Sequence, residues 1–250
     1  MESSEYKLMS EVQDGHWWWL GRRKIIETMI ERHIDCSQKL LIADVGCGFG
    51  ANIPMLRQYG DVVGLELQED ALRAVKKKWG EENARVWKSP EKLMQQFDLI
   101  LMADVLEHIP NDQEAVEWMF DHLKDGGHAL LTVPAHQFFW SQMDEAVHHI
   151  RRYGHGQFLA LFYGKWKIKK FSFYNFFLFP IKAAFVVVTR FLRVFSLNDK
   201  TRSYNDIPPS LINILFKYIL WIESELIANL SLPFGVSMVI LVQKPARSSL

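Results

Sequence analysis

The stretch Asp44-Val45-Gly46-Cys47-Gly48-Phe49-Gly50 decides the fold. It ends the short apolar run from Lys39 to Val45, which predicts a buried strand, and it precedes a helical stretch from Asn52 to Gln58. Glycine between a strand and a helix lets the backbone approach a ligand closely, because no Cβ intervenes and φ can be positive. The segment therefore predicts a ligand-binding turn at the start of an α/β domain.

Further apolar runs and helical patterns alternate after this turn. The expected strands and helices are Val62 to Glu66, Gln68 to Trp79, Phe97 to Met102, Gln113 to Leu123 and His128 to Val133. This alternation predicts a doubly wound sheet. Two more strands are expected from Trp166 to Phe171 and from Val236 to Val242, with two hydrophobic helices between them.

The length of 250 residues predicts a single domain with appendages. The amphipathic pattern from Trp17 to Ile34 favours a helical cap before the main domain. We expect four parts: a helical cap at 1–36, a cofactor-binding core at 37–170, a hydrophobic helical insertion at 171–233 and a final strand at 234–245.

The composition restricts the partners. Lys plus Arg and Asp plus Glu both number 29, so the formal net charge is zero and no nucleic acid is expected as a partner. The two cysteines, Cys36 and Cys47, lack the spacing of a disulfide framework or a zinc site. Met1 to Asp14 lacks the apolar stretch of a signal peptide, so a cytoplasmic location is expected. The oligomeric state stays open.

The glycine turn alone does not choose the cofactor. Gly46, Gly48 and Ala51 also satisfy the dinucleotide pattern, so a nicotinamide-dependent oxidoreductase is an alternative. Asp44 favours S-adenosylmethionine, because negative charge is unfavourable beside a pyrophosphate and acceptable beside a sulfonium and an ammonium group. Asp44 could instead only brace the turn by accepting backbone hydrogen bonds.

The expected fourth strand ends in the polar stretch from Asp104 to His108. Open α/β sheets bind ligands at the carboxyl ends of their strands, so this stretch and the glycine turn are expected to face one crevice. His108 could also cap the following helix. Glu66 ends another buried strand, where an acidic side chain needs a polar partner.

These motifs resemble the class I methyltransferase family, whose first motif reads Asp-x-Gly-x-Gly-x-Gly and whose fourth strand, in one branch, ends in Val-Leu-Glu-His. The resemblance covers Lys39 to Pro134 well and implies a seven-stranded sheet with an antiparallel last strand. It implies S-adenosylmethionine as cofactor, with its ribose on Glu66 and its adenine flanked by Ser89-Pro90-Glu91; Ser89 departs from the acid common in relatives. The other expected cofactor residues are Asp44, Gly46, Cys47, Gly48, Gly50, Leu67, Ala103, Asp104, Val105 and His108.

The segment from Val133 to Tyr153 is expected to bind the methyl acceptor, because it leaves the same sheet edge. A similar pattern occurs in a bacterial subset of the family that also shares the Trp-Trp-x-x-Gly-Arg-Arg stretch at Trp18 to Arg23. The expected acceptor-binding residues are Trp18, Arg22, Arg23, Trp140, Asp144, Arg151, Arg152 and Tyr153. The arginines could bind an anion or form salt bridges to Asp144 or Glu145.

A general base is needed only if the acceptor is protonated. His149, or else His108 or His136, is the candidate, because imidazole titrates near neutral pH. A metal site is not expected, because His148 and His149 are adjacent and the cluster lacks the helical spacing of two histidine ligands.

The helical insertion carries Lys182, Arg190 and Arg193 on one arc of an otherwise apolar helix. That pattern favours a helix in the membrane interface on the inner face of the membrane. The aromatic cluster at Trp17 to Trp19 favours a small-molecule, lipid-like or lipid-carrier-linked acceptor, because its rings could line an acyl or prenyl chain. The alternatives are that both helices cover the sheet or form a dimer interface. A noncatalytic protein that binds S-adenosylmethionine is also open.

Overall fold

The computed structural model describes residues 11–81, 84–86, 93–195 and 207–246. Its centre is a seven-stranded sheet in the order β3-β2-β1-β4-β5-β7-β6, in which β7 runs antiparallel to both of its neighbours. The strands are β1 (Leu40–Val45), β2 (Gly60–Glu66), β3 (Ala84–Val86), β4 (Phe97–Ala103), β5 (Leu123–Pro134), β6 (Lys167–Tyr174) and β7 (Ser237–Gln243). The predicted α/β sheet is confirmed, and β3 is an additional strand that the sequence patterns did not indicate.

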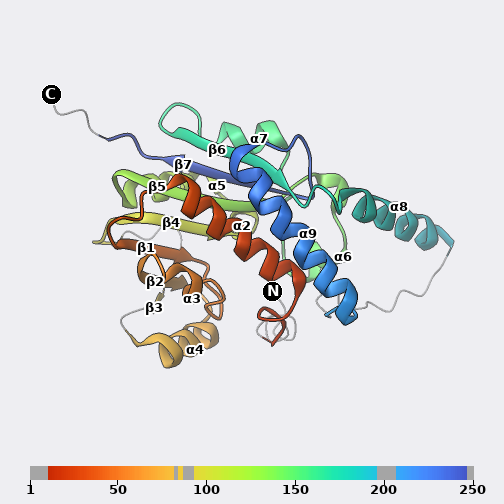
Figure 1. Ribbon diagram of the computed structural model, residues 1–250, viewed down its shortest axis with the longest axis horizontal. Coiled ribbons are helices and arrows are strands. Elements are labelled where there is room, and N and C mark those ends of the chain that lie inside the picture. The colour runs from red at the N-terminus through yellow and green to blue at the C-terminus, as the bar shows by residue number, and fades with distance from the viewer. Residues whose placement is uncertain (1–10, 82–83, 87–92, 196–206, 247–250) are drawn as a thin grey trace.

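Helices cover both faces of this sheet (Figure 1). They are α2 (Trp17–His33), α3 (Ile53–Leu56), α4 (Glu69–Trp79), α5 (Asp112–His122), α6 (Gln142–Ala146), α7 (His155–Ala160), α8 (Phe179–Phe195) and α9 (Ser210–Asn229), with 3-10 turns η2 (Leu106–His108) and η3 (Gln137–Phe139). The expected helices are present, with shifted ends. The short helices α6 and α7 were not expected.

The parallel strands β1, β2, β4 and β5 place their carboxyl ends at one edge of the sheet. Val45 pairs with Leu65 of β2 and with Met102 of β4, and Met102 pairs with Leu131 of β5. The segments that follow these strands therefore begin side by side, although they are far apart in the sequence.

Two separate cores hold the helices against the sheet. On one face, Ile25 and Met29 of α2 and Ile227 of α9 pack with β4 and β7 side chains such as Leu99 and Leu241. On the other face, helix α5 and the rings of Phe158 and Phe162 pack with the neighbouring residues of the same strands, such as Ile100 and Ile240. This alternation is what burial on both faces of a parallel sheet requires.

Helix α2 packs closely against α9 (Figure 1), and Gly21 is at their contact. A Cβ placed at Gly21 would lie 2.3 Å from Cδ1 and 2.7 Å from Cβ of Leu220. The N-terminal cap and the second insertion helix therefore form one layer over the sheet.

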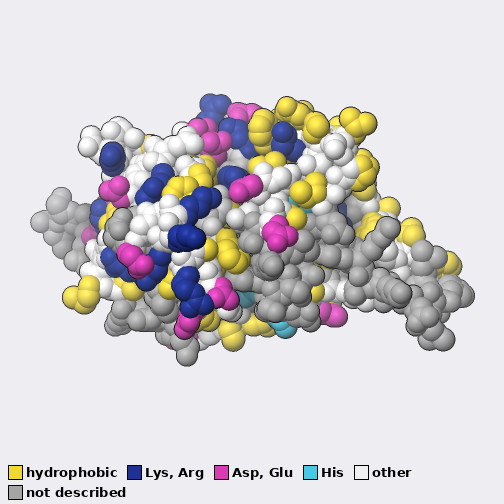
Figure 2. Space-filling model, turned by 90° about the horizontal axis from the view of Figure 1, so that it is seen from below, with side chains coloured by type: hydrophobic (Ala, Val, Ile, Leu, Met, Phe, Trp, Pro, Cys, Tyr) yellow, Lys and Arg dark blue, Asp and Glu magenta, His cyan; other side chains and the backbone are white. Residues whose placement is uncertain are grey.

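The helical insertion begins later than expected. Phe171 to Tyr174 belong to β6, in which Phe171 pairs with Ile240 of β7. The boundary at residue 171 is therefore wrong, because the alternating pattern of the strand continues past it. Helix α8 points away from the body of the fold (Figure 1), and hydrophobic side chains gather at that end of the molecule in Figure 2.

The expected orientation of the cationic arc is wrong for the two described side chains. Arg190 donates hydrogen bonds to the carbonyl oxygens of Phe138 at 2.7 Å and Trp140 at 3.2 Å. Burial lowers the pKa of Lys182, and the nearby charge of Arg152 adds to that effect. Arg190 therefore faces the loop after β5, which offers carbonyl acceptors, and Lys182 lines a depression with Trp140 of the same loop. The side chain of Arg193 lies outside the described part.

Helices α8 and α9 each expose apolar side chains, and these exposed side chains are called the apolar face of α8 and α9 below. Exposed side chains include Ile181, Val188, Phe191, Leu211, Leu215 and Ile222. Within the described residues, neither helix meets the length and hydropathy needed to cross a membrane.

Candidate functional site

The glycine turn after β1 has the backbone that the sequence predicts. Gly46, Gly48 and Gly50 have φ angles of 66°, 53° and 79°, which favour glycine. A Cβ at Gly46 would lie 2.6 Å from Cγ2 of Val105, so the turn packs tightly against the segment after β4. At Gly48 a Cβ would meet nothing within 4 Å. The backbone at Gly48 therefore borders open space, where a ligand can approach it.

Glu66, at the end of β2, is the residue that braces this turn. Its Oε2 accepts a hydrogen bond from the Gly48 N–H at 2.8 Å, and its Oε1 accepts from the N–H groups of Leu67 at 2.8 Å and Gln68 at 2.9 Å. These contacts supply the polar partners that a buried acid needs. Glu66 thus ties the turn to the start of α4. Cys47 is buried beside it, whereas Leu67 is exposed.

Asp44 is buried beneath the turn at 1% exposure, and its Oδ2 has no hydrogen-bond partner among the described residues. Burial raises the pKa of Asp44 to about 7, although a hydrogen bond with Asn52 and the charge of Arg22 oppose this rise. An orphaned buried acid is costly unless a cation or donor reaches it. The turn, Glu66 and Asp44 therefore fit a ligand that carries a positive charge.

Arg22 joins the N-terminal cap to the end of β4. Its Nη1 donates to Oδ2 of Asp104 at 2.5 Å and to the carbonyl oxygen of Ala103 at 3.3 Å. The other carboxylate oxygen of Asp104 accepts from the Thr132 hydroxyl at 3.0 Å. Asp104 adopts a φ of 55°, a conformation that is uncommon outside glycine and that clusters at functional sites. The predicted acceptor residue Arg22 is therefore a buried partner of Asp104.

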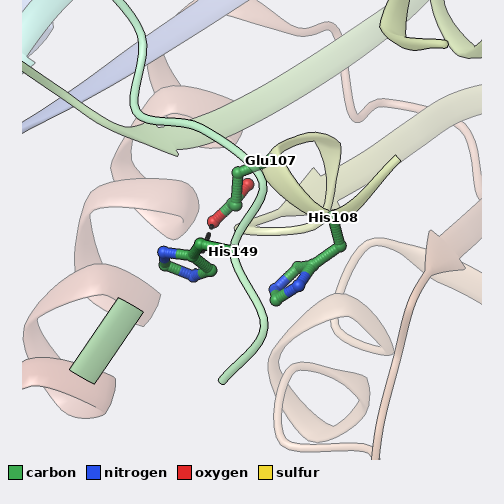
Figure 3. A group of neighbouring side chains, drawn as sticks. All are labelled: Glu107, His108 and His149. Carbon is green, nitrogen blue, oxygen red and sulfur yellow. Dashed lines mark ion pairs between the residues drawn. The ribbon is translucent and has the colours of Figure 1, made fainter. Parts of the chain in front are cut away.

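Just after Asp104, the chain contributes Glu107 and His108 to a second cluster of polar side chains, which His149 completes. Glu107 and His108 lie in η2, and His149 follows α6; Figure 3 shows the three side chains together. His149 Nε2 lies 3.6 Å from Oε1 of Glu107, and the rings of His108 and His149 meet edge to face at 4.8 Å. Burial and the charge of His149 lower the pKa of His108 to about 4. Burial and the charge of Asp104 raise the pKa of Glu107 well above its ordinary value.

Asp144 holds His149 from the side opposite Glu107. Its Oδ1 accepts from His149 Nδ1 at 2.8 Å and from Arg152 Nε at 2.7 Å, and its Oδ2 accepts from the N–H of Ser141 at 2.8 Å. Burial would raise the pKa of Asp144, but the hydrogen bond from His149 and the charge of Arg152 outweigh it, so the pKa is about 2. Asp144 is fully buried, and it orients His149 and Arg152 rather than presenting a surface for the acceptor.

Several predicted acceptor residues are placed elsewhere. Arg151 pairs with Asp112 at 2.5 Å, not with Asp144 or Glu145. Tyr153 is fully buried and donates to Asp112 at 3.0 Å, so the expectation that it contacts the acceptor is wrong. Arg23 donates to the carbonyl oxygen of Gln13 at 3.1 Å, away from Arg22.

The remaining predicted side chains are aromatic or packed among aromatics. The His136 ring stacks on Phe173 at 5.4 Å and also meets Phe179. Trp18 stacks on Tyr174 at 5.8 Å, whereas Trp140 lines a depression between the loop after β5 and α8. The His136 ring therefore packs among phenylalanine rings of η3, β6 and α8. The predicted adenine segment, Ser89-Pro90-Glu91, lies outside the described residues.

Glu107 is the site residue that sequence reasoning missed. The Val-Leu-Glu-His motif assigns no role to this glutamate, yet it is fully buried and neither carboxylate oxygen has a hydrogen-bond partner within the described part of the chain. An acid between Leu106 and a histidine at the end of a buried strand was the available signal.

Comparison with known proteins identifies the family. A family described as a methyltransferase domain matches residues 23–175, which is more than half of the chain. One curated relative, the ubiquinone biosynthesis O-methyltransferase of Photorhabdus laumondii, is 29% identical over 99 residues. That match covers 36% of this chain and 41% of the relative, so the chain spans less than half of the relative's length in it.

Solved structures share the fold at low sequence identity. The plantazolicin methyltransferase BpumL, in complex with a pentazolic desmethylPZN analog and SAH, gives a TM-score of 0.58 at 12% identity, covering 98% of this chain and 92% of that chain. The [4+2]-cyclase SpnF gives a TM-score of 0.53 at 14% identity, covering 90% and 82%. The cyclase illustrates that a shared fold does not fix the reaction. The sequence match, rather than the fold, shows that this chain belongs to the methyltransferase domain family, with S-adenosylmethionine as its cofactor.

Proposed function

We propose that this protein methylates a hydroxyl group of a small, lipid-like acceptor. One observation carries the proposal: a glycine turn with a buried acid, Asp44, whose Oδ2 has no partner among the described residues, shares a sheet edge with the pair Glu107 and His149. The turn with Asp44 suits a cationic cofactor, and the pair Glu107 and His149 suits removal of a proton from the acceptor. A methyl transfer to oxygen needs both functions at adjacent positions.

On the cofactor side, Asp44 and the backbone at Gly48 would hold the methionine part, and Glu66 the ribose. Each group has a reason in the geometry. Asp44 has a free oxygen, Gly48 borders open space, and the Glu66 carboxylate is held in place by three backbone donors. When bound, S-adenosylmethionine supplies a methyl group that its sulfonium has already activated.

On the acceptor side, His149 is the best candidate for the general base. Its Nδ1 is bound to Asp144, an acid that is ionised and can only accept, so Nδ1 carries the proton and Nε2 has the free lone pair. An acceptor hydroxyl would give its proton to this Nε2 as its oxygen forms the bond to the methyl carbon. His108 is the second candidate, and His136 is disfavoured by its aromatic packing.

Two further observations support a lipid-like acceptor. The curated relative is named for O-methylation in ubiquinone biosynthesis, which motivates a hydroxyl on a molecule with an apolar part. The exposed apolar face of α8 and α9 offers a surface for such a part, or for the lipid phase that contains it. This face replaces the cationic arc as the basis for a membrane contact.

The test is transfer of labelled methyl from S-adenosylmethionine into small-molecule and lipid fractions of a cell extract. We expect the label in the lipid fraction, where the labelled product should be a methyl ether rather than a methyl ester or a methylamine. Thermal-shift assays should show stabilisation by S-adenosylhomocysteine and none by NAD. Label confined to water-soluble products would refute the lipid-like acceptor, and stabilisation by NAD alone would refute the cofactor assignment and favour the oxidoreductase alternative.

A further inference from the structure

Three side chains that can ligate a metal converge beside the expected acceptor site. The ligand atoms of Glu107, His108 and His149 all lie within 4.8 Å of one another, and His149 Nε2 is 3.6 Å from Oε1 of Glu107. Figure 3 shows that they come from two separate segments of the chain, η2 and the segment after α6. Among the described residues, no other group of three His, Cys, Asp or Glu side chains meets this spacing.

The state of Glu107 requires an explanation that protein contacts do not supply. Its side chain is fully buried, yet no described residue donates a hydrogen bond to either carboxylate oxygen. A buried carboxylate is very costly without a cation or donors. The charges of Arg22 and Arg152 act on Glu107, but Arg22 is bound to Asp104 at 2.5 Å, and Arg152 is bound to Asp144 through Nε at 2.7 Å and Nη2 at 3.2 Å.

Both histidines are oriented as metal ligands usually are. His149 Nδ1 donates to Oδ1 of Asp144 at 2.8 Å, and His108 Nδ1 donates to the carbonyl oxygen of His148 at 3.2 Å. Since a carboxylate and a carbonyl only accept, each ring carries its proton on Nδ1, and its Nε2 lone pair is free. Metal-binding histidines commonly make this outer hydrogen bond to a carboxylate or a backbone carbonyl.

We propose that Glu107, His108 and His149 bind one divalent transition-metal ion such as Zn²⁺ or Mn²⁺. Two imidazole nitrogens and one carboxylate oxygen form a common ligand set that leaves coordination positions open. With bond lengths of about 2.1 Å, tetrahedral ligand atoms lie about 3.4 Å apart. The separation of 3.6 Å between Glu107 and His149 is close to this value, and small side-chain rotations would close the rest.

The role of the ion rests on the proposed function. Its open positions would face the acceptor hydroxyl, whose pKa a bound divalent ion would lower, and the proton would then leave to solvent. His149 would be a ligand rather than the general base. Binding of the ion does not depend on this role and can be measured without any acceptor.

The experiment titrates Co²⁺ into the metal-stripped full-length protein and follows visible absorption, with Zn²⁺ competition and calorimetry in parallel. We expect one Co²⁺ per chain, displaced by Zn²⁺, and a rise in melting temperature with the ion. Glu107→Gln, which keeps the shape of the side chain, and His149→Ala should each weaken binding at least about 100-fold. The control is His148→Asn, because His148 is exposed and Asn tolerates its φ of 58°.

The outcomes separate the two proposals. No Co²⁺ binding by the folded wild type, or equal binding by wild type and Glu107→Gln, would overturn the metal site. If methyl transfer then persists in EDTA, the proposed function stands with His149 as base. Stoichiometric Co²⁺ binding that depends on Glu107 would support the site even if no methyl transfer is found. Loss of binding in His148→Asn alone would show an adventitious surface site and overturn the proposal.

Discussion

Arg22 and Asp104 form a buried ion pair that fastens helix α2 to the end of β4, with Nη1 of Arg22 2.5 Å from Oδ2 of Asp104. The Arg22 side chain is 5% exposed and that of Asp104 is 18% exposed. Burial disfavours the charged form of Arg22, but the charges of Asp104, Tyr174 and Glu107 and the hydrogen bond to Asp104 together outweigh this effect and raise the pKa of Arg22. The cap is therefore held at the same edge of the sheet as the glycine turn.

Arg22→Met should destabilise the protein by about 3 kcal/mol, because it leaves the Asp104 carboxylate largely buried without its cation. Urea unfolding followed by circular dichroism measures the change. The adjacent residue gives a matched control. Arg23→Met removes a partly exposed arginine and should cost less than about 0.5 kcal/mol. Equal losses in the two variants would mean that the ion pair with Asp104 contributes nothing specific.

Cofactor affinity should rise with pH through about 7, the pKa to which burial raises Asp44. Below that pH the folded protein holds Asp44 neutral, and above it the carboxylate can pair with a cation. Because the folded protein binds the Asp44 proton more tightly than the unfolded chain does, this proton stabilises the fold fully below pH about 4. That stabilisation is lost as the pH rises towards 7. S-adenosylhomocysteine should bind about tenfold more tightly at pH 8 than at pH 6 by calorimetry. Asp44→Asn should flatten this profile, and an unchanged slope would exclude Asp44 as its source.

Glu66→Ala should weaken S-adenosylhomocysteine binding by about 10- to 150-fold, because a charge-assisted hydrogen bond to the ribose contributes about 1.5 to 3 kcal/mol. It should also lower the melting temperature, since the N–H groups of Gly48, Leu67 and Gln68 lose their acceptor. Glu66→Gln keeps one acceptor oxygen and should restore part of both. Undiminished affinity in Glu66→Ala, measured by calorimetry on folded protein, would limit Glu66 to bracing the turn.

Gly21→Ala should destabilise the protein by about 1 to 3 kcal/mol despite the better helix propensity of alanine, because its Cβ would meet Leu220. The double variant with Leu220→Gly removes both the Cδ1 and the Cβ that would meet that methyl group. In the Leu220→Gly background, Gly21→Ala should therefore be neutral or stabilising by up to about 1 kcal/mol. Additive losses in a double-mutant cycle would show that the two residues do not clash.

The apolar face of α8 and α9 makes a prediction for membranes that differs from that of a cationic arc. The wild type should float with neutral phosphatidylcholine vesicles, and salt should not release it, because the exposed contacts are apolar. Leu215→Asp with Ile222→Asp should reduce flotation. Tyr163→Asp, an exposed position after α7, is the control. Protein that stays at the bottom of every gradient, or that floats only with anionic vesicles at low salt, contradicts this surface assignment.

The sequence predicts the sheet well where each strand carries its own signal. The runs that became β1, β4 and β7 are apolar because both faces are buried, and this pattern is visible without a structure. The three residues of β3 carry no such signal. Their place is fixed only by pairing with the end of β2, where Ala84 lies opposite Gly64.

The site divides in the same way. Asp44 and the glycines lie in one turn, so their spacing predicts them as a group, and Glu66 is predicted separately by the buried strand that it ends. The cluster of Glu107, His108 and His149 joins two segments that only the folded chain brings together. For α8, helical periodicity places Lys182 and Arg190 on one side, but it cannot say whether that side faces solvent or the carbonyl oxygens of Phe138 and Trp140.

The position of β7 has a consequence for how the chain folds during synthesis. β7 is synthesised after the six other strands of this sheet, yet it fills an interior place, where Gln243 pairs with His128 of β5 and with Lys167 of β6. Until it emerges, β5 and β6 each expose an unpaired apolar edge, which is prone to intermolecular pairing. Closing loops of this length is also slow. Nascent chains that stall before Ser237 should therefore depend on chaperones, and emergence of the β7 segment, Ser237–Gln243, should trigger cooperative closure of the whole sheet.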